Sequence, residues 1–472
     1  MQDRFITAVG GYLPLLRYDR AAGAEALRSF GLGGRGRGHR ALSGWDEDAL
    51  TLAVEAAREI PTCDKLIFAS TSAPFFERAH APLVIDALGW PRATRTNDVA
   101  GSRRCAIAAL SDAMQGHGTA AIVAGDKRMT RPGSIHHLGY GDAGAAVAIG
   151  DAGSARLIGQ ASLAHDLLDV YASREHPTPY AYEERFARET ASREVILPTV
   201  KQACAAAGVD GSAIAHAAVH EPVAGMWRDI SRALGTAAPN HAAPLEASVG
   251  DLGAAHALFA LALALDAAAP GDIVLVAGFG SGCDALLFEM MDKTPGARAV
   301  ADSLRYGVTT DDYPRLLALT GAIDLDFGVR SEFETKTQAT VIERHGRAAM
   351  GFVGGRDTSG NVQFPKTRIP VRPDADGPEP MADVRLADLD ARLVSVTADR
   401  LNYTPDPPFW FGLVQFDNGA RVLMELTDAA APGFVVGDAL QMRFRIKSID
   451  RKRGMRTYFW KAAPAARPAL ED

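Results

Sequence analysis

The apolar residues follow two different patterns along the chain. Over residues 1–290, short apolar runs alternate with longer stretches of helical character, such as 47–60 and 193–208. Small or polar residues bound each run, as expected of strands that are covered on both faces. The runs lie at 65–70, 119–125, 145–150, 214–220 and 272–278. This alternation predicts a layered α/β fold.

The second pattern begins near residue 384. Strand-like segments follow one another there without intervening helices, at 392–403, 411–428, 439–450 and 457–464. Asn418 and Gly419 predict a hairpin, because Asn-Gly readily takes the positive φ of a type I′ turn. Five or so antiparallel strands in ~80 residues fit a small all-β barrel of the OB-fold type. Residues 291–383 lie between the two patterns, with a helix predicted at 313–321 and a Pro- and Asp-rich linker at 370–380.

Composition and charge exclude several classes of protein. The chain has 472 residues, with 50 Lys and Arg against 57 Asp and Glu, and the resulting net charge of −7 argues against a dedicated nucleic-acid binder. The most apolar stretch, 254–269, is shorter than the ~20 residues of a membrane span, so we expect a buried helix there. The N-terminus carries charges from residue 3 onward and does not resemble a signal peptide. We therefore expect a cytoplasmic protein with no membrane association.

The cysteines exclude two further kinds of structure. The chain has four of them, and no two have the Cys-x-x-Cys spacing: Cys63, Cys105, Cys204 and Cys283. Neither a disulfide framework nor a zinc ribbon built on cysteine alone is available to this sequence.

Three stretches contain residues that could carry chemistry. His220 ends an apolar run and precedes Pro222, so it is either a proton-transfer group on a loop or a structural histidine. The sequence GFGSG at 278–282 offers backbone N–H groups that could stabilise an oxyanion, or it is a tight turn between core strands. Cys105 begins a small-residue helix after a strand, where a thiol is either a nucleophile or a small buried core residue.

Taken together, these stretches resemble the thiolase superfamily, and within it the branch of 3-hydroxy-3-methylglutaryl-CoA (HMG-CoA) synthase and ketoacyl synthase III. Archaeal-type HMG-CoA synthases are the nearest pattern, matched by His220 with Pro222 and by segments 68–76, 140–150 and 265–286. The resemblance implies an α-β-α-β-α fold in two halves for residues 1–290. It also implies an acyl-CoA thioester as substrate, no tightly bound cofactor, and a homodimer formed through the central sheets.

The nucleophile of that family is missing from its expected position. The family's cysteine stands seven residues before a helical leucine, and counting back from Leu110 gives Arg103. Cys105 stands two residues later, about half a helical turn away, so its side chain would point in another direction. An arginine cannot form an acyl-enzyme, but it can bind a carboxylate, a thioester oxygen or a phosphate.

Two other family residues are also replaced. The general-acid glutamate falls at Thr71 and the asparagine falls at Asp251, so His220 alone remains of the usual four. Arg103 and Asp251 could form a buried ion pair in place of the catalytic pair. A local shift of the chain that restores Cys105 as nucleophile is a third interpretation.

Residues 300–465 resemble the OB-fold proteins with a rubredoxin-like zinc ribbon that accompany thiolases. The resemblance rests on 395–428, 436–445 and 458–464, while 354–370 occupies the place of the family's zinc-binding cysteines. Asp357 and Ser359 stand there, and they are not ligands of a structural zinc site. We therefore expect a metal-free remnant of the ribbon and no zinc. The predicted domains are 1–290, 291–383 and 384–472.

Two functions follow from these resemblances. The first is an acyl-CoA-dependent enzyme that forms or breaks carbon–carbon bonds without a cysteine intermediate, by aldol, retro-aldol or Claisen-type chemistry. The alternative is a non-catalytic subunit that shapes the CoA channel of a complex with a thiolase. In the enzymatic interpretation, the expected roles are a proton shuttle for His220, a base for Asp251, a substrate-oxygen ligand for Arg103 and an acid for Tyr140, with substrate contacts from Thr71, Gly280, Ser281 and Gly282.

Overall fold

The protein is described here from a computed structural model. It covers residues 3–32, 36–181, 183–221, 223–328, 339–375 and 377–470, without the side chains of 184, 186, 187 and 339–343. Pro222, part of the motif around His220, therefore lies outside the described residues.

A nine-stranded mixed sheet forms the frame of the first unit. Its order is β11-β12-β13-β8-β1-β7-β6-β4-β5. The parallel pairs are β11 with β12, β6 with β4, and β4 with β5, and the other pairs are antiparallel. The strands are β1 (Phe5–Tyr12), β4 (Lys65–Ala69), β5 (Arg95–Val99), β6 (Ala120–Asp126), β7 (Ala143–Gly150), β8 (Ala155–Ala164), β11 (Ile214–Val219), β12 (Ile273–Phe279) and β13 (Gly282–Met290). Five of them match the apolar runs that the sequence pattern predicts.

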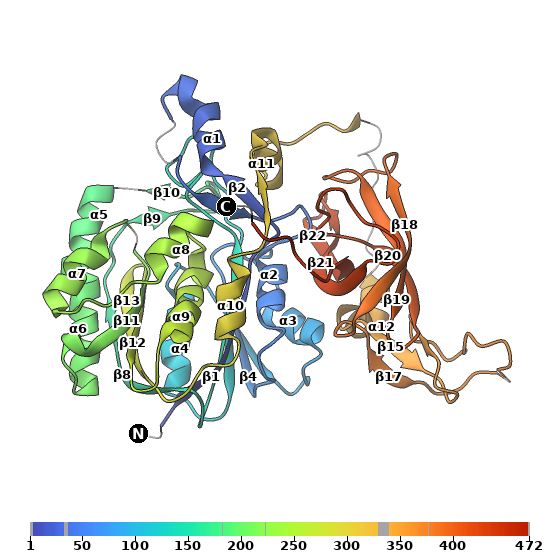
Figure 1. The fold of residues 1–472 in the computed structure, drawn as a ribbon, viewed down its shortest axis with the longest axis horizontal. Coiled ribbons are helices and arrows are strands. Elements are labelled where there is room, and N and C mark those ends of the chain that lie inside the picture. The colour runs from blue at the N-terminus through green and yellow to red at the C-terminus, as the bar shows by residue number, and fades with distance from the viewer. Residues whose placement is uncertain are drawn as a thin grey trace.

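The sheet's two halves enclose a pair of apolar helices, α4 (Cys105–Met114) and α9 (His256–Ala267). Helices α2 (Ala49–Ala56) and α3 (Ala81–Leu88) cover one outer face, and α6 (Leu197–Ala207) and α7 (Met226–Leu234) cover the other. Figure 1 shows these five layers in succession. Because α9 is covered on all sides, its apolar residues do not need to form a single stripe.

Shorter elements complete the first unit and extend it beyond residue 290. Strand β14 (Val308–Thr310) pairs in parallel with β2 (Leu16–Asp19), which also pairs with β3 (His39–Leu42). The other elements are α1 (Arg20–Leu27), β9 (Val170–Tyr171), β10 (Tyr180–Ala181), α5 (Glu184–Thr190), a π-helical turn at Ala191–Ile196, α8 (Ala242–Val249), α10 (Ala297–Ser303) and α11 (Tyr313–Leu319). Since α11 packs on Leu16 and Tyr18, the first unit runs to about residue 319 and the predicted boundary at 290 is too early.

A small sheet occupies the region of the predicted zinc ribbon. After α12 (Ala339–Met350), strands β15 (Val353–Arg356), β16 (Val362–Gln363) and β17 (Ala382–Arg385) pair in the order β16-β15-β17. Strand β17 crosses the predicted boundary at 383. Beyond β15, the Asp357 carboxylate accepts the backbone N–H groups of Ser359 and Asn361, each at 2.9 Å, and Arg372 lies 3.4 Å away.

The C-terminal unit is a five-stranded antiparallel sheet, ordered β20-β19-β18-β21-β22. Its strands are β18 (Ala391–Asp399), β19 (Phe409–Phe416), β20 (Arg421–Glu425), β21 (Ala439–Asp450) and β22 (Met455–Pro464). A parallel bridge between Leu426 and Ala462 joins the two ends of the sheet, and the N–H of Thr427 donates to the Ala462 carbonyl at 2.9 Å. The sheet therefore curls until its outer strands meet, around a core that includes Phe444 and Trp460.

Matched charges join the two units. Asp48 accepts the N–H groups of Leu50 and Thr51 and so begins α2, and its other carboxylate oxygen lies 2.8 Å from Arg456 of β22. The neighbouring Asp46 and Glu47 pair with basic residues of the C-terminal unit in the same way. Figure 1 shows β21 and β22 beside α2. Within the described residues, no helix is both long and apolar enough to cross a membrane.

Candidate functional site

Asp251 lies at the centre of the site, where two loops pair beyond the sheet. Its N–H donates to the Gly139 carbonyl at 2.9 Å, and its carbonyl accepts the N–H of Gly141 at 2.9 Å. Gly250, with φ +95°, precedes it, and a Cβ there would stand 2.6 Å from the Gly141 nitrogen. The close approach of these two loops requires glycine at position 250.

Three cationic or ionisable side chains surround the Asp251 carboxylate. Arg128 lies 3.1 Å from Oδ1, His220 Nε2 lies 3.3 Å from the same oxygen, and Arg103 lies 3.8 Å from Oδ2. Burial alone would raise the pKa of Asp251, but Arg128 and His220 outweigh it and hold that pKa well below its usual value. Asp251 is therefore a permanent carboxylate that accepts hydrogen bonds, and a poor base at neutral pH.

His220 follows β11 and stacks on His256 with ring centroids 4.4 Å apart. Both nitrogens of His256 are engaged, because Nδ1 accepts the N–H of Leu252 at 3.2 Å and Nε2 faces the Ala242 carbonyl at 3.3 Å. Burial, followed by the nearby His220, lowers the pKa of His256 to about 3, so this ring is neutral. His220 presents Nε2 to Asp251, while its Nδ1 has no hydrogen-bond partner among the described residues. This leaves one imidazole nitrogen able to take up a proton.

His220, Asp251 and His256 also have the spacing of a metal site, with ligand atoms within 4.8 Å of one another. The chemistry of the cluster does not suit a cation. Both nitrogens of His256 are used in hydrogen bonds, and the guanidinium of Arg128 already occupies the carboxylate. A metal ion would have to displace these contacts beside two positive charges.

Arg103, and not Cys105, faces this cluster. Arg103 lies in the turn before α4 and forms ion pairs with Asp169 and with Asp251, and its guanidinium lies 6.0 Å from the ring centroid of Phe279. Cys105 is the first residue of α4 and is 6% exposed, and burial together with Asp126 raises the pKa of its thiol to about 12. A protonated, enclosed thiol of this kind is a poor nucleophile.

The GFGSG turn presses against the loop that carries Arg103. Ser102 Oγ donates to the Gly280 carbonyl at 3.1 Å, and a Cβ on Gly280 would stand 2.7 Å from that oxygen. The N–H of Gly280 donates to the Gly282 carbonyl at 2.9 Å, and Ser281 between them has φ +48°. The Gly280 amide is therefore spent inside the turn and is not available as an oxyanion donor.

Thr71 and Tyr140 are both held by neighbouring charges. Thr71 Oγ1 donates to Asp126 at 2.8 Å, and the same carboxylate accepts the N–H of Ala254 at 2.7 Å. Tyr140 is 3% exposed, with the guanidinium of Arg128 3.4 Å from its ring centroid. Burial raises the pKa of Tyr140, which therefore stays a neutral phenol. The structure thus gathers Tyr140, Arg103, His220 and Asp251, while Thr71 points to Asp126.

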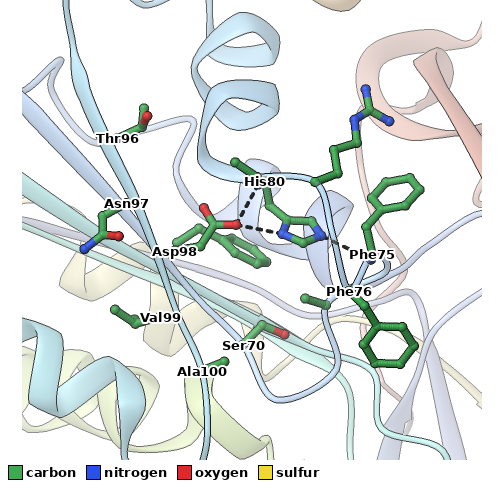
Figure 2. A pocket seen from close by; sticks show the side chains of 13 residues that line it. Ser70, Phe75, Phe76, His80, Thr96, Asn97, Asp98, Val99 and Ala100 are labelled. Atoms are coloured by element: carbon green, nitrogen blue, oxygen red, sulfur yellow. Dashed lines mark hydrogen bonds and ion pairs between the residues drawn. The ribbon is translucent and has the colours of Figure 1, made fainter. Parts of the chain in front are cut away.

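A separate cavity of about 440 Å³ lies beside the edge strand β5. Figure 2 shows His80 at its wall, bound to Asp98 at 2.8 Å through Nδ1 and accepting the N–H of Phe75 at 3.2 Å through Nε2. The Asp98 carboxylate also accepts the N–H groups of His80 and Ala81 at the start of α3. Both nitrogens of His80 are used in these contacts, which hold the loop in place.

Comparisons with known proteins agree with this architecture. No family model matches the chain. Hydroxymethylglutaryl-CoA synthase of Aeropyrum pernix is 26% identical over 320 residues, covering 63% of this chain and 84% of that protein. The enzyme of the same name from Pyrobaculum arsenaticum is 29% identical over 318 residues, with 61% and 88% covered.

Solved structures lead to the same fold. PksG, an HMG-CoA synthase from Bacillus subtilis, superposes with a TM-score of 0.56 at 18% identity, covering 72% of this chain and 95% of that one. The 3-oxoacyl-(acyl carrier protein) synthase III of Pseudomonas aeruginosa gives 0.54 at 18% identity, with 61% and 98% covered. The first unit has the thiolase-like fold of these synthases. The expected α-β-α-β-α architecture is thereby confirmed for this unit.

Within this fold, the sequence pattern missed three residues of the site. Arg128 and Asp126 belong to the charged run 126–128, which begins at the last residue of the apolar strand β6, and that run was a usable signal. Asp169 has no such signal, because it lies on an irregular loop and reaches Arg103 through the tertiary structure alone.

Proposed function

We propose that this chain binds an acyl-CoA thioester and makes or breaks a carbon–carbon bond without a cysteine acyl intermediate. The observation that carries the proposal is the pair His220–Asp251 beside Arg103, the residue at which the sequence resemblance implies the family's nucleophile. The similarity to HMG-CoA synthases supports a thioester substrate. One further comparison, to an HMG-CoA synthase complexed with CoA (TM-score 0.56, 16% identity, 78% and 95% covered), supports the fold of such a site.

The proposed chemistry needs one base and one oxyanion ligand. In the bond-forming direction, His220 Nδ1 takes the α-proton of the thioester, and Asp251 offsets the charge of the imidazolium. The electron pair of the broken C–H bond moves onto the thioester oxygen, where Arg103 donates a hydrogen bond. The enolate carbon then attacks a carbonyl, and the new alkoxide takes the proton back from His220.

The bond-breaking direction uses the same groups. His220 takes the proton of a 3-hydroxyl group, the carbon–carbon bond breaks, and its electron pair forms the enolate held by Arg103. Protonation of the enolate carbon by His220 returns the base to its starting state. We assign Tyr140 the role of a neutral hydrogen-bond donor near the same carboxylate, because burial keeps its phenol protonated.

Exchange of α-protons tests this proposal without knowledge of the co-substrate. The purified chain is incubated with acetyl-CoA in D₂O, and deuterium uptake is followed by mass spectrometry. We expect exchange that falls about 100-fold or more in His220→Ala, as loss of a general base entails. Cys105→Ala should exchange at the full rate, and intact-mass measurement should show no acyl adduct. An adduct that maps to Cys105 would overturn the proposal.

The second candidate is a non-catalytic subunit of a complex with a thiolase. Arg103 at the nucleophile position, engaged by Asp169 and Asp251, favours this candidate, since no acyl-enzyme can form there. For this candidate, we expect no deuterium exchange into acetyl-CoA by the chain alone, and turnover once a thiolase encoded beside it is added.

We further propose that the C-terminal unit is an OB-type barrel preceded by a metal-free ribbon. The strand order and the Leu426–Ala462 bridge support the barrel, and the contacts of Asp357 with Ser359 and Arg372 support a ribbon that needs no metal. Less than about 0.1 zinc per chain in elemental analysis is the expected result, and stoichiometric zinc contradicts it.

A homodimer through the first unit is the expected assembly. Strand β5 is an exposed edge of the nine-stranded sheet, and an unpaired edge is a template for strand pairing. Light scattering should give a mass near 100 kDa, twice the 50.0 kDa of the chain.

A further inference from the structure

A second inference rests on the proposed function and concerns the substrate that the site accepts. Asp169 forms an ion pair with Arg103, and the side chains of both residues are 10% exposed. Asp169 belongs to segment 165–181, which follows β8 and carries the two short strands β9 and β10. These strands lie at the upper left of the first unit in Figure 1. The nucleophile position is thus closed by a side chain from a surface segment.

Few contacts attach this segment to the rest of the protein. Leu167 packs into the apolar cluster around α6, and the guanidinium of Arg174 lies 5.0 Å from the ring centroid of Phe76. Tyr171 and Tyr180 contact each other, with 47% and 61% of their surfaces exposed. Within the part of the chain that the structure describes, the Arg103–Asp169 pair is the one ion pair from segment 165–181 to the site.

Arg103 keeps its own carboxylate partner only while this segment is in place. Arg128 has both Asp251 and Asp126 nearby, whereas Arg103 has Asp169 and, at a longer distance, Asp251. If the segment withdraws, Arg103 keeps only Asp251, which lies 3.8 Å away and is already paired with Arg128 at 3.1 Å. A buried guanidinium left short of a partner is costly. Opening the site is therefore least costly when another anion takes the place of Asp169.

We propose that the site takes an acyl-CoA whose acyl chain ends in a carboxylate, and that this carboxylate replaces Asp169 on Arg103 when segment 165–181 opens. The planar guanidinium matches a carboxylate with two parallel hydrogen bonds, so the exchange conserves both charge and geometry. An uncharged acyl chain of the same length would open the segment without replacing the lost ion pair.

Calorimetric titration with succinyl-CoA and butyryl-CoA tests this inference, because their acyl chains have equal length and differ in the terminal carboxylate. We expect the native chain to bind succinyl-CoA about tenfold or more tightly than butyryl-CoA. Asp169→Asn should tighten both complexes and keep the preference, because the competing carboxylate is gone while Arg103 remains. Arg103→Met should abolish the preference.

The matched control is Asp166→Asn, which removes an exposed acid from the same segment without touching Arg103 and should leave both affinities unchanged. Hydrogen exchange of residues 165–181 should be faster in Asp169→Asn than in this control. Should Arg103→Met fail to fold, Arg103→Lys is the second variant. It keeps the positive charge but loses the two parallel donors of the guanidinium, so it should reduce the preference for succinyl-CoA. Equal affinities of the native chain for the two thioesters overturn this inference and leave the proposed function standing. No binding of either thioester overturns both.

Discussion

Two clusters of buried charge among the described residues, one at the contact between the units and one around Asp251, are built differently. At the contact between the units, Arg445 is fully buried on β21, 3.2 Å from Glu47 and 3.1 Å from Asp428, and donates to the Tyr12 hydroxyl at 2.7 Å. Burial by itself would raise the pKa of Asp428, yet Arg445 and Arg467 lower it to about 2. Arg445 stands within β21, and its partners Glu47 and Asp428 lie in the loops that adjoin α2 and β20.

Around Asp251 the partners are held less completely. Arg103 depends on Asp169, which lies on an irregular surface segment, and His220 has a nitrogen without a partner among the described residues. Burial of charge therefore does not mark a functional site in this protein. What distinguishes the cluster around Asp251 is an imidazole nitrogen without a partner among the described residues, together with an ion-pair partner from a surface segment.

The largest effect should come from breaking the contact between the units. Arg445→Met leaves Glu47 buried without its cation and Asp428 with Arg467 alone, and we expect the free energy of unfolding in urea to fall by about 3–5 kcal/mol. Arg421→Met, on the exposed side of β20, is the matched control and should cost about 0.5 kcal/mol or less. A loss near the control value would show that this cluster is no more important for stability than a surface pair.

A smaller loss is expected when the site loses its central charge. Asp251→Asn removes the carboxylate, but Arg128 still donates to the backbone carbonyl of residue 251 and Arg103 keeps Asp169. We expect the unfolding free energy to fall by about 2 kcal/mol, less than for Arg445→Met. Asp229→Asn, an exposed acid on α7, is the control. A loss equal to that of Arg445→Met would remove the difference between the two clusters.

The sequence predicted the fold well where local pattern determines it. The apolar runs gave strands β4, β6, β7, β11 and β12, because strands covered on both faces need apolar residues at every position. The boundary at 290 failed for a different reason. Strand β14 has three residues, and its partner β2 lies almost at the other end of the sequence. Such a pairing leaves no local trace.

The candidate site was predicted in part for similar reasons. Arg103, Tyr140, His220 and Asp251 could be named from their places relative to family motifs, and the structure brings them together. Their proposed roles await the exchange experiment. Asp169 could not be named, since its position depends on how a loop returns over the turn before α4.

Acid should weaken the two clusters in different pH ranges. The pKa of His256 is about 3 in the folded chain, so the unfolded chain binds more protons below about pH 6.5, and stability is lost as the pH falls from there. Asp428 has a pKa lowered to about 2, so its contribution is intact above about pH 4 and is lost below it. Of the two clusters, the one around Asp251 therefore weakens between pH 6.5 and 4, and His137 and His241, whose pKa values burial lowers to about 4, add to the loss in this range.

Urea unfolding at pH 7, 6 and 5 checks this separation. Each buried histidine of this kind contributes a slope of up to about 1.4 kcal/mol per pH unit. His256→Asn should reduce the slope by about that amount, while the exposed His117→Asn should leave it unchanged. A slope that is the same in all three proteins would mean that His256 takes up its proton without opening the site.

The smallest effect on stability is expected from replacing Cys105, the cysteine nearest in sequence to the nucleophile position that the family resemblance implies. Cys105 is 6% exposed and its thiol has a pKa of about 12, so at pH 7.5 almost none of it is thiolate. Cys105→Ala removes one buried sulfur and should cost about 1 kcal/mol or less. Iodoacetamide should leave Cys105 unlabelled in the native chain and label it in urea. Rapid labelling under native conditions would show a reactive thiol beside Asp126, and the contrast between an inert cysteine and an active His220 would no longer hold.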